Sequence, residues 1–434
     1  MTTDPVAIAL LLGLFVVFIV IKVPIAFALA LSSFASAYYL GISLGAITQQ
    51  LVKGMNSFSL LAIPFFILAG EIMGEGGISD RLIKFSDVLI GRMRGGLAMV
   101  NILASMFFGG ISGSAVADTS SIGAMMIPMM VKQGYDVDYS VDVTIASACQ
   151  GVLIPPSHNM IIYASAIGGL SVGKLFMAGL VPGIILGVAL MILSYVMAVK
   201  RNYPRGEKYT RAEAWKIAVD SIFGLMTAVI IIAGVFTGIF TAIESAAVAC
   251  IWAFFVTFFI YREVPLSRMW VILKKTLKTL AMVMSVIAAS QAFGYMMTTL
   301  RIPTMISNFL LTLTSNRVAL LLLINIALLV LGCIMDMAPL ILITAPILLP
   351  VVTSPAIGMD PVQFGIVMML NLSIGLLTPP VGTVLYVGSS IGGISIEKAA
   401  KSMLPFYATM VAVLLLLTFV PALSMTVPNM MFGK

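Results

Sequence analysis

The chain has 434 residues, of which 61% are hydrophobic and only 9% are charged. Soluble domains have about 45–50% apolar and about 25% charged residues, whereas this chain has a mean hydropathy of +1.13. Stretches near the roughly 20 apolar residues that a helix needs to cross a bilayer recur along the whole length. Composition therefore excludes a soluble enzyme and a protein with a single anchor. The net charge of +7 is attributed to loops on one side of a membrane rather than to nucleic-acid binding.

The three cysteines indicate neither a disulfide framework nor a metal site. Cys149, Cys250 and Cys333 are far apart, lie in apolar contexts and form no CxxC pair. We expect them to be small packing residues.

The first apolar run, residues 6–21, is predicted to be a retained span. An acid and no base precede it, whereas a secretory signal peptide has a positive start. Lys22 is its only flanking base, which predicts that the N-terminus is outside and Lys22 inside. Hydropathy predicts nine further spans, near 23–44, 55–73, 139–168, 174–199, 217–240, 242–260, 279–297, 363–392 and 398–423.

Two further apolar stretches, 96–130 and 319–352, are too long for one span and are interrupted by small and polar residues. We interpret them as re-entrant helical hairpins, because irregular backbone at membrane depth is tolerated only inside protein or beside water. The first would open inward and the second outward. This topology puts most of the 24 Lys and Arg residues inside, as expected of cytoplasmic loops. Those left outside are Lys53, Lys174, Arg301, Arg317 and Lys434.

The chain contains an internal repeat. Residues 151–174 align without a gap to 375–398, at an offset of 224, and ten of the 24 positions are identical. Both copies contain a Gly-x-x-(Ile/Thr)-Pro-Pro segment, and the charge count predicts that the two halves have opposite orientation. Inverted repeats with paired broken helices indicate a secondary transporter with a central binding site.

The Pro-Pro segments supply the chemistry for such a site. Proline lacks an amide donor and clashes with the preceding turn, so each pair leaves carbonyls without helical partners, which is costly in lipid. Unwound carbonyls and hydroxyls suit a sodium ion, and half-helix N-termini suit a carboxylate. The alternative is a structural kink whose carbonyls are satisfied by neighbouring helices and water.

A membrane-embedded enzyme is the rival class. Metal hydrolysis needs a cluster such as HExxH, which the single histidine, His158, cannot supply. There is no serine nucleophile with an evident general base, and no P-loop that would bind ATP. The sequence therefore predicts no enzymatic activity.

Several segments resemble the large membrane subunit of tripartite ATP-independent periplasmic (TRAP) transporters, and the likeness runs from about residue 5 to 425. The segments are MNSFSLLAIPFFILAGEIM, GGISDRL, FFGGISGSAVADTSSIGAMMIPMM, GVLIPPS and GLLTPPVGTVLYV. One departure is Thr241-Ala242-Ile243-Glu244, where relatives usually have Thr-Pro-Thr-Glu.

The resemblance implies an all-α polytopic protein of the bacterial inner membrane. Its two inverted repeats would each carry a re-entrant hairpin and a Pro-Pro-broken helix in an elevator-type fold. The implied function is sodium-coupled symport of an organic acid, such as a sugar acid, sialic acid or C4-dicarboxylate. The implied partners are a small four-helix membrane subunit and a periplasmic substrate-binding protein. A stand-alone sodium-coupled carboxylate carrier is the alternative.

Site residues follow from the same resemblance. Sodium site 1 would use Ser112, Gly113, Ser114, Gly151, Ile154 and Ser157, and sodium site 2 would use Asp336, Met337, Ala338, Gly375, Thr378 and Val381. The substrate would contact Ser114, Ser157, His158, Asn159 and Thr383.

Other polar residues have two interpretations each. His158 could bind substrate or relay a proton, or it could stabilise a helix end. Asp118 and Asp336 lie in the apolar hairpins, where ionisable residues are usually functional, with N-capping as the alternative. Glu244 is expected to stabilise a helix N-terminus. Glu71 and Glu75 are expected to cap a helix or to pair with Arg81 or Lys84.

The predicted domain organisation alternates scaffold and transport segments. Residues 79–94 read as an interfacial arm helix. The scaffold comprises 1–95, 174–318 with a second arm, and 398–434, and the transport domain comprises 96–173 and 319–397.

Overall fold

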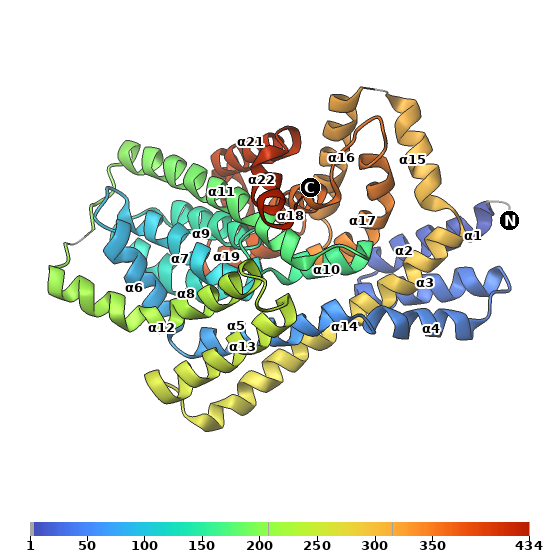
Figure 1. Ribbon diagram of the computed structural model, residues 1–434. Coiled ribbons are helices and arrows are strands. Elements are labelled where there is room, and N and C mark those ends of the chain that lie inside the picture. Colours follow the sequence, from blue (N-terminus) through green and yellow to red (C-terminus); the bar gives the residue numbers. More distant parts are fainter. Residues whose placement is uncertain (1–3, 207, 315, 434) are drawn as a thin grey trace.

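A computed structural model describes residues 4–206, 208–314 and 316–433, except for the side chains of Ser59, Ile111, Ser112 and Leu311. The regular elements of these ranges are all helices, and the β-pairing found there is one isolated bridge between Arg94 and Arg205. Figure 1 shows the helices packed around a centre formed by elements from both halves of the chain. The predicted all-α fold is confirmed.

The first half runs from α1 to α11. Its elements are α1 (Pro5–Ile8), η1 (Ala9–Gly13), α2 (Leu14–Val20), α3 (Ile25–Tyr39), α4 (Leu44–Met55), η2 (Phe58–Leu61), α5 (Ala62–Glu75), α6 (Ile78–Ile90), α7 (Gly96–Ser112), α8 (Ala115–Lys132), α9 (Val137–Gly151), α10 (His158–Ile167) and α11 (Val172–Lys200).

The second half runs from α12 to α22. Its elements are α12 (Arg211–Phe236), α13 (Ala242–Phe255), η3 (Val256–Tyr261), η4 (Leu266–Arg268), α14 (Met269–Thr299), α15 (Ile302–Leu313), α16 (Arg317–Gly332), α17 (Met337–Val352), α18 (Pro361–Gly375), α19 (Thr383–Gly392), α20 (Ile396–Ser402), α21 (Leu404–Phe419) and α22 (Ala422–Phe432).

Among the described helices, four are long and apolar enough to cross a membrane: α11, α12, α13 with η3, and η4 with α14. The number rises to six at most if each of two bent helix pairs is counted as one span. In these pairs α6 turns from α5 by 73° and α21 turns from α20 by 56°. The predicted spans 6–21, 23–44 and 363–392 fall on shorter apolar helices. The two spans that contain Pro-Pro are broken as predicted, into α9 and α10 and into α18 and α19.

The repeat is visible in the helix boundaries. α9 and α18 begin and end at positions 224 residues apart, and each is followed by a break with a cis Pro-Pro peptide bond. The apolar stretches 96–130 and 319–352 form the helix pairs α7–α8 and α16–α17, interrupted near Gly113 and near Asp336. Each stretch that the sequence predicted as a hairpin therefore contains one break between two helices.

Glycine pairs bring each hairpin against its broken helix. A Cβ on Gly109 would lie 2.3 Å from the Cα of Gly151, and a Cβ on Gly375 would lie 2.5 Å from the Cα of Gly332. The halves also meet at equivalent positions, since the Cys149 thiol donates to the Ser373 carbonyl at 3.2 Å, across 224 residues. Contact between equivalent positions is what an approximate two-fold axis requires.

The cysteine prediction is confirmed for the part of the chain that is described. Cys149 and Cys250 are buried, Cys333 is half-buried, and all three are free. Cys149 and Cys250 belong to the buried apolar core, as small side chains in close-packed interiors do.

The positions of glycine and proline explain one long helix and one sharp helix junction. The predicted span 279–297 lies within the longer helix α14, which begins at Met269 because no Gly or Pro interrupts the chain from Leu266 to Phe293. In Figure 1, α14 runs below the centre from α13 to the α3–α4 pair, and it contacts α3, α4, α5 and α17. At the α5–α6 junction, Gly77 has a φ of +69°, which favours glycine.

The predicted partners of Glu75 are wrong. Glu75 pairs with Arg268 at 3.1 Å and with Lys275, whereas Arg81 pairs with Asp220 at 2.9 Å and with Glu263. The 73° bend turns α6 away from the end of α5 and toward α12, which carries Asp220. Arg81 and Glu75 are near in sequence but form ion pairs with different residues.

Glu244 has the structural role expected of it. With Thr241 it forms a capping box at the start of α13, in which the Glu244 carboxylate accepts from the Thr241 amide at 2.8 Å. The departure from the family pattern at Ala242 and Ile243 leaves this cap intact, because the cap uses only the first and last residues of the motif.

Candidate functional site

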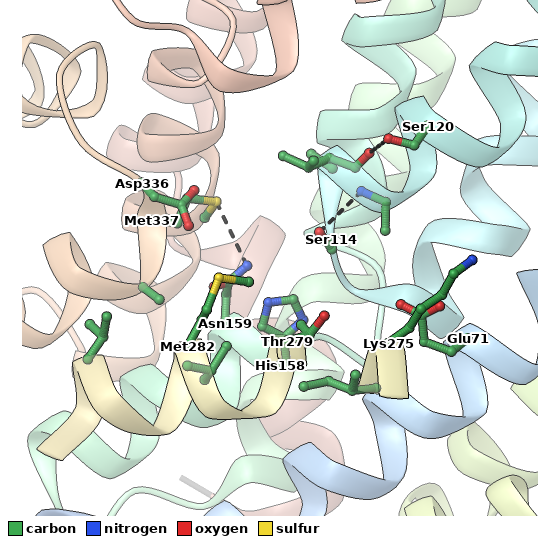
Figure 2. Close-up of a pocket in the computed structure, with 18 of the residues that line it drawn as sticks. Glu71, Ser114, Ser120, His158, Asn159, Lys275, Thr279, Met282, Asp336 and Met337 are labelled. Atoms are coloured by element: carbon green, nitrogen blue, oxygen red, sulfur yellow. Dashed lines mark hydrogen bonds between the residues drawn. The ribbon is translucent and has the colours of Figure 1, made fainter. Parts of the chain in front are cut away.

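A cavity of about 960 Å³ lies between the two hairpins and the α3, α5 and α14 helices. The hairpins contribute residues from α8 and α17, and the first break contributes His158 and Asn159 at the start of α10. Figure 2 shows Asp336 and Met337 on one side, Ser114 on the other, and α14 closing the cavity with Thr279 and Met282. The cavity is therefore built from both repeats.

The tip of the first hairpin lies against the first break. Gly113, with a φ of +62°, ends α7, and Ser114 caps α8 by accepting from the Ala117 amide at 3.3 Å. A Cβ on Gly113 would lie 2.9 Å from the His158 amide nitrogen and 3.1 Å from the Ser157 Cα. Only glycine allows so close an approach.

Asn159 connects the two hairpins. Its Nδ2 donates to the Gly113 carbonyl at 3.5 Å and to the Met337 sulfur at 3.9 Å, and the side chain is only 4% exposed. The Met337 contact is drawn in Figure 2. A single amide at the start of α10 thus touches the tips of both α7–α8 and α16–α17.

The residues predicted for sodium site 1 come together at this tip. Gly113, Ser114 and Ser157 are neighbours, and Gly151 packs on Gly109 one turn away, while the side chain of Ser112 lies outside the described residues. Ser157 is fully buried, and its hydroxyl oxygen has no hydrogen-bond partner among the described residues. A buried hydroxyl normally has a partner, so an oxygen-seeking cation fits this position.

The residues predicted for sodium site 2 gather at the second tip. The Val381 amide donates to the Cys333 carbonyl at 3.1 Å, which holds the second break against the end of α16. The Thr378 hydroxyl donates to the Ile374 carbonyl at 2.8 Å. Asp336 occupies the N-cap position of α17 and lines the cavity with its neighbours Met337 and Ala338. Asp336 adds a carboxylate that the first tip lacks.

The five predicted substrate contacts fall in three places. Ser114, His158 and Asn159 line the cavity, and Ser157 is buried directly behind it. Thr383 begins α19 and is not among the lining residues. The cavity wall also contains Glu71, Ser120, Ser121, Lys275 and Thr279, which sequence reasoning did not assign to it.

Charge is unevenly distributed around the cavity. Three carboxylates, Glu71, Glu75 and Asp336, line it together with one ammonium group, that of Lys275. Glu75 is already paired with Lys275 and with Arg268. Apart from these pairs, the lining residues contribute two further carboxyl groups, those of Glu71 and Asp336, and no further ammonium group.

The carboxylate of the first hairpin lies deeper than the cavity. Asp118, in the first turn of α8, is fully buried and is absent from the cavity wall. Neighbouring polar contacts join α7 to α9, with Asn101 donating to Thr144 at 2.6 Å and Ser147 to Ser105 at 3.2 Å. Ser114, not Asp118, holds the N-cap position of α8.

The chain has two inverted halves, and each half brings a hairpin tip to a broken helix beside one central cavity. This arrangement defines a multi-pass secondary transporter. The fold is similar to that of the YdaH transporter of Alcanivorax borkumensis, with a TM-score of 0.60, 13% identity, and coverage of 86% of this chain and 88% of that one. This likeness concerns the fold alone.

The family model of the DctM component of tripartite ATP-independent periplasmic transporters matches residues 12–423, and the chain belongs to that family. It is 41% identical to a putative TRAP transporter large permease protein of Haemophilus influenzae, over 93% of this chain and 95% of that one. It is 39% identical to the 2,3-diketo-L-gulonate TRAP transporter large permease protein of Escherichia coli K12, over 96% and 98% respectively. These relatives are transporter permeases, which confirms that the chain is not an enzyme.

Proposed function

We propose that this permease subunit imports an organic acid across the bacterial inner membrane by symport with sodium. A periplasmic binding protein delivers the acid, and a small four-helix membrane subunit completes the complex. The family supports the tripartite assembly, and a relative named for 2,3-diketo-L-gulonate supports an organic acid as substrate.

The observation that carries the coupling is the double contact of Asn159. An ion that fixes the first tip on its break also fixes the Gly113 carbonyl, and with it the amide that reaches Met337 on the second tip. Ions and substrate that favour the same arrangement of these groups bind cooperatively. Asn159 thus makes the two tips one unit.

Charge explains why an anionic substrate needs cations here. In their ionised forms Glu71 and Asp336 repel an organic anion, and the ammonium group that lines the cavity, that of Lys275, is paired with Glu75. In a partly dehydrated cavity such repulsion is much stronger than in water. Cations bound at the hairpin tips reverse the local charge and make room for a carboxylate.

The oxygen groups at both tips are those that sodium prefers. The first set comprises the Ser157 hydroxyl with backbone carbonyls near Gly113 and Gly151, and the second comprises the Asp336 carboxylate with carbonyls of the break that contains Thr378. Unwound carbonyls and hydroxyls at broken helices are the usual ligands of coupling ions.

Ser157→Ala is expected to raise the sodium concentration for half-maximal uptake about tenfold, the effect of losing one polar contact to a charged group. The removed oxygen has no hydrogen-bond partner among the described residues, so folding is not expected to suffer. Ser120→Ala is the matched control, because Ser120 lines the same cavity but its hydroxyl donates to the Val116 carbonyl of its own helix. Equal sodium dependence in Ser157→Ala and the parent would remove Ser157 from the site.

Uptake is expected to depend on both partners. Liposomes that contain the chain alone should show little uptake of an organic acid under an inward sodium gradient, and addition of the small subunit and the loaded binding protein should restore it. Robust uptake by the chain alone would instead support the stand-alone carboxylate carrier of related architecture. An outward sodium gradient is the control, and it should give no accumulation.

A further inference from the structure

A second, smaller cavity of about 270 Å³ lies at the surface where α11 ends, away from the transport cavity. Its wall comes from two loops and one helix: the loop before α7, the last turns of α11, and the loop after α11. The lining residues are Arg92, Met93, Arg94, Tyr195, Val199 and Arg205. Half of its wall is therefore arginine.

The backbone forces two of these arginines together. Arg94 and Arg205 form an antiparallel bridge, and the Gly95 amide donates to the Pro204 carbonyl at 3.0 Å beside it. Side chains of directly opposed residues project to the same side of such a pair, and like charges there are destabilising. An anion bound between the two guanidinium groups would relieve this repulsion.

Within the described ranges, which leave out residue 207, no acidic side chain supplies this anion. The ion pairs there include none of Arg92, Arg94 and Arg205. The neighbouring Arg201 shows the contrast, because it pairs with Asp136 at 2.8 Å. The Tyr203 hydroxyl and then Arg201 hold the pKa of that carboxyl below its usual range.

The rest of the wall is apolar and exposed. Tyr195, Val199 and Met93 are 40%, 38% and 45% exposed. α11 is one of the helices long enough to cross a membrane, and Tyr195 and Val199 lie in its last turns. Tyrosine is enriched at the level of lipid headgroups, so the cavity combines a polar end with an apolar side that faces acyl chains.

We propose that this cavity binds the phosphate of an anionic phospholipid in the inner leaflet, with Arg92, Arg94 and Arg205 as its ligands. Guanidinium groups bind phosphate oxygens in pairs with matching geometry, and basic pockets between membrane helices on the cytoplasmic side bind such headgroups. Basic loops that only set orientation need neither a shared cavity nor opposed arginines. The bound phosphate reduces the repulsion between the two arginines of the bridge, and the lipid holds the α6–α7 loop against the end of α11.

To test this, the full-length purified chain in detergent is titrated with phosphatidylglycerol, with phosphatidylcholine and with inorganic phosphate. Bound lipid is measured by native mass spectrometry. Three variants are compared with the parent: Arg205→Gln, the triple Arg92→Gln, Arg94→Gln and Arg205→Gln, and a control triple Lys208→Gln, Arg211→Gln and Lys216→Gln. The control removes the same charge from the same cytoplasmic region without touching the cavity wall.

We expect phosphatidylglycerol to bind in preference to phosphatidylcholine. Its affinity should fall about fivefold in Arg205→Gln, the effect of one basic residue near an anionic lipid, and further in the cavity triple than in the control triple. Equal losses in the two triples would show general charge attraction and overturn the proposal. Equal binding of phosphatidylcholine, or full displacement of lipid by inorganic phosphate, would overturn it as well. The single variant keeps the test valid if the cavity triple does not fold.

Discussion

Gly151→Val is expected to reduce transport to less than about a tenth of the parent rate, because overpacking of a tight helix contact costs about 1–3 kcal/mol or more. A Cβ on Gly151 would lie 2.6 Å from the Cα of Gly109, and backbone atoms cannot move aside as a flexible side chain can. The equivalent Gly375→Val should have the same effect, with its Cβ 2.5 Å from Gly332. Uptake in liposomes and thermal unfolding in detergent measure the two consequences.

Gly294→Val is the matched control for both substitutions. Gly294 also lies within a helix of the membrane region, α14, but a Cβ there meets nothing within 4 Å. It therefore tests the change in residue type without the helix contact. If Gly151→Val and Gly375→Val behave like Gly294→Val, the close packing of hairpin on broken helix, and with it the two-fold architecture, is not the working structure.

Asn159→Leu is expected to lower uptake by about tenfold or more, because leucine has a similar size but leaves the buried Gly113 carbonyl without its donor, at a cost of about 1–3 kcal/mol. The link to Met337 is lost at the same time. We expect the dependence of uptake on sodium to become less steep, since binding at one hairpin tip no longer affects the other tip through Asn159. Initial uptake rates over a range of sodium concentrations measure both effects.

Asn308→Leu supplies the comparison for this prediction. Asn308 is exposed on α15 and is not among the residues that line the cavity. Its substitution should leave uptake close to that of the parent. Unchanged cooperativity in Asn159→Leu, with normal uptake, would mean that the contact across the cavity does not couple the tips.

Backbone chemistry made the breaks of this fold predictable. Proline pairs at 155–156 and 379–380 and glycine at 113 act on the chain locally, whatever packs around them. The inverted repeat was equally accessible, because its offset of 224 residues is a property of the sequence and reappears in the bounds of α9 and α18. Class, family likeness and the composition of both hairpin tips follow from such local signals.

Tertiary structure alone decided which side chains share the cavity and which charges pair. Glu75 and Lys275 meet across 200 residues of sequence, and Lys275 and Thr279 reach the cavity only because α14 runs beneath both hairpins. The partner of Arg81 depends on the 73° bend after α5. The physical reason is that helix amphipathicity limits which face is buried but not which neighbour buries it, since apolar surface contributes by area and without direction.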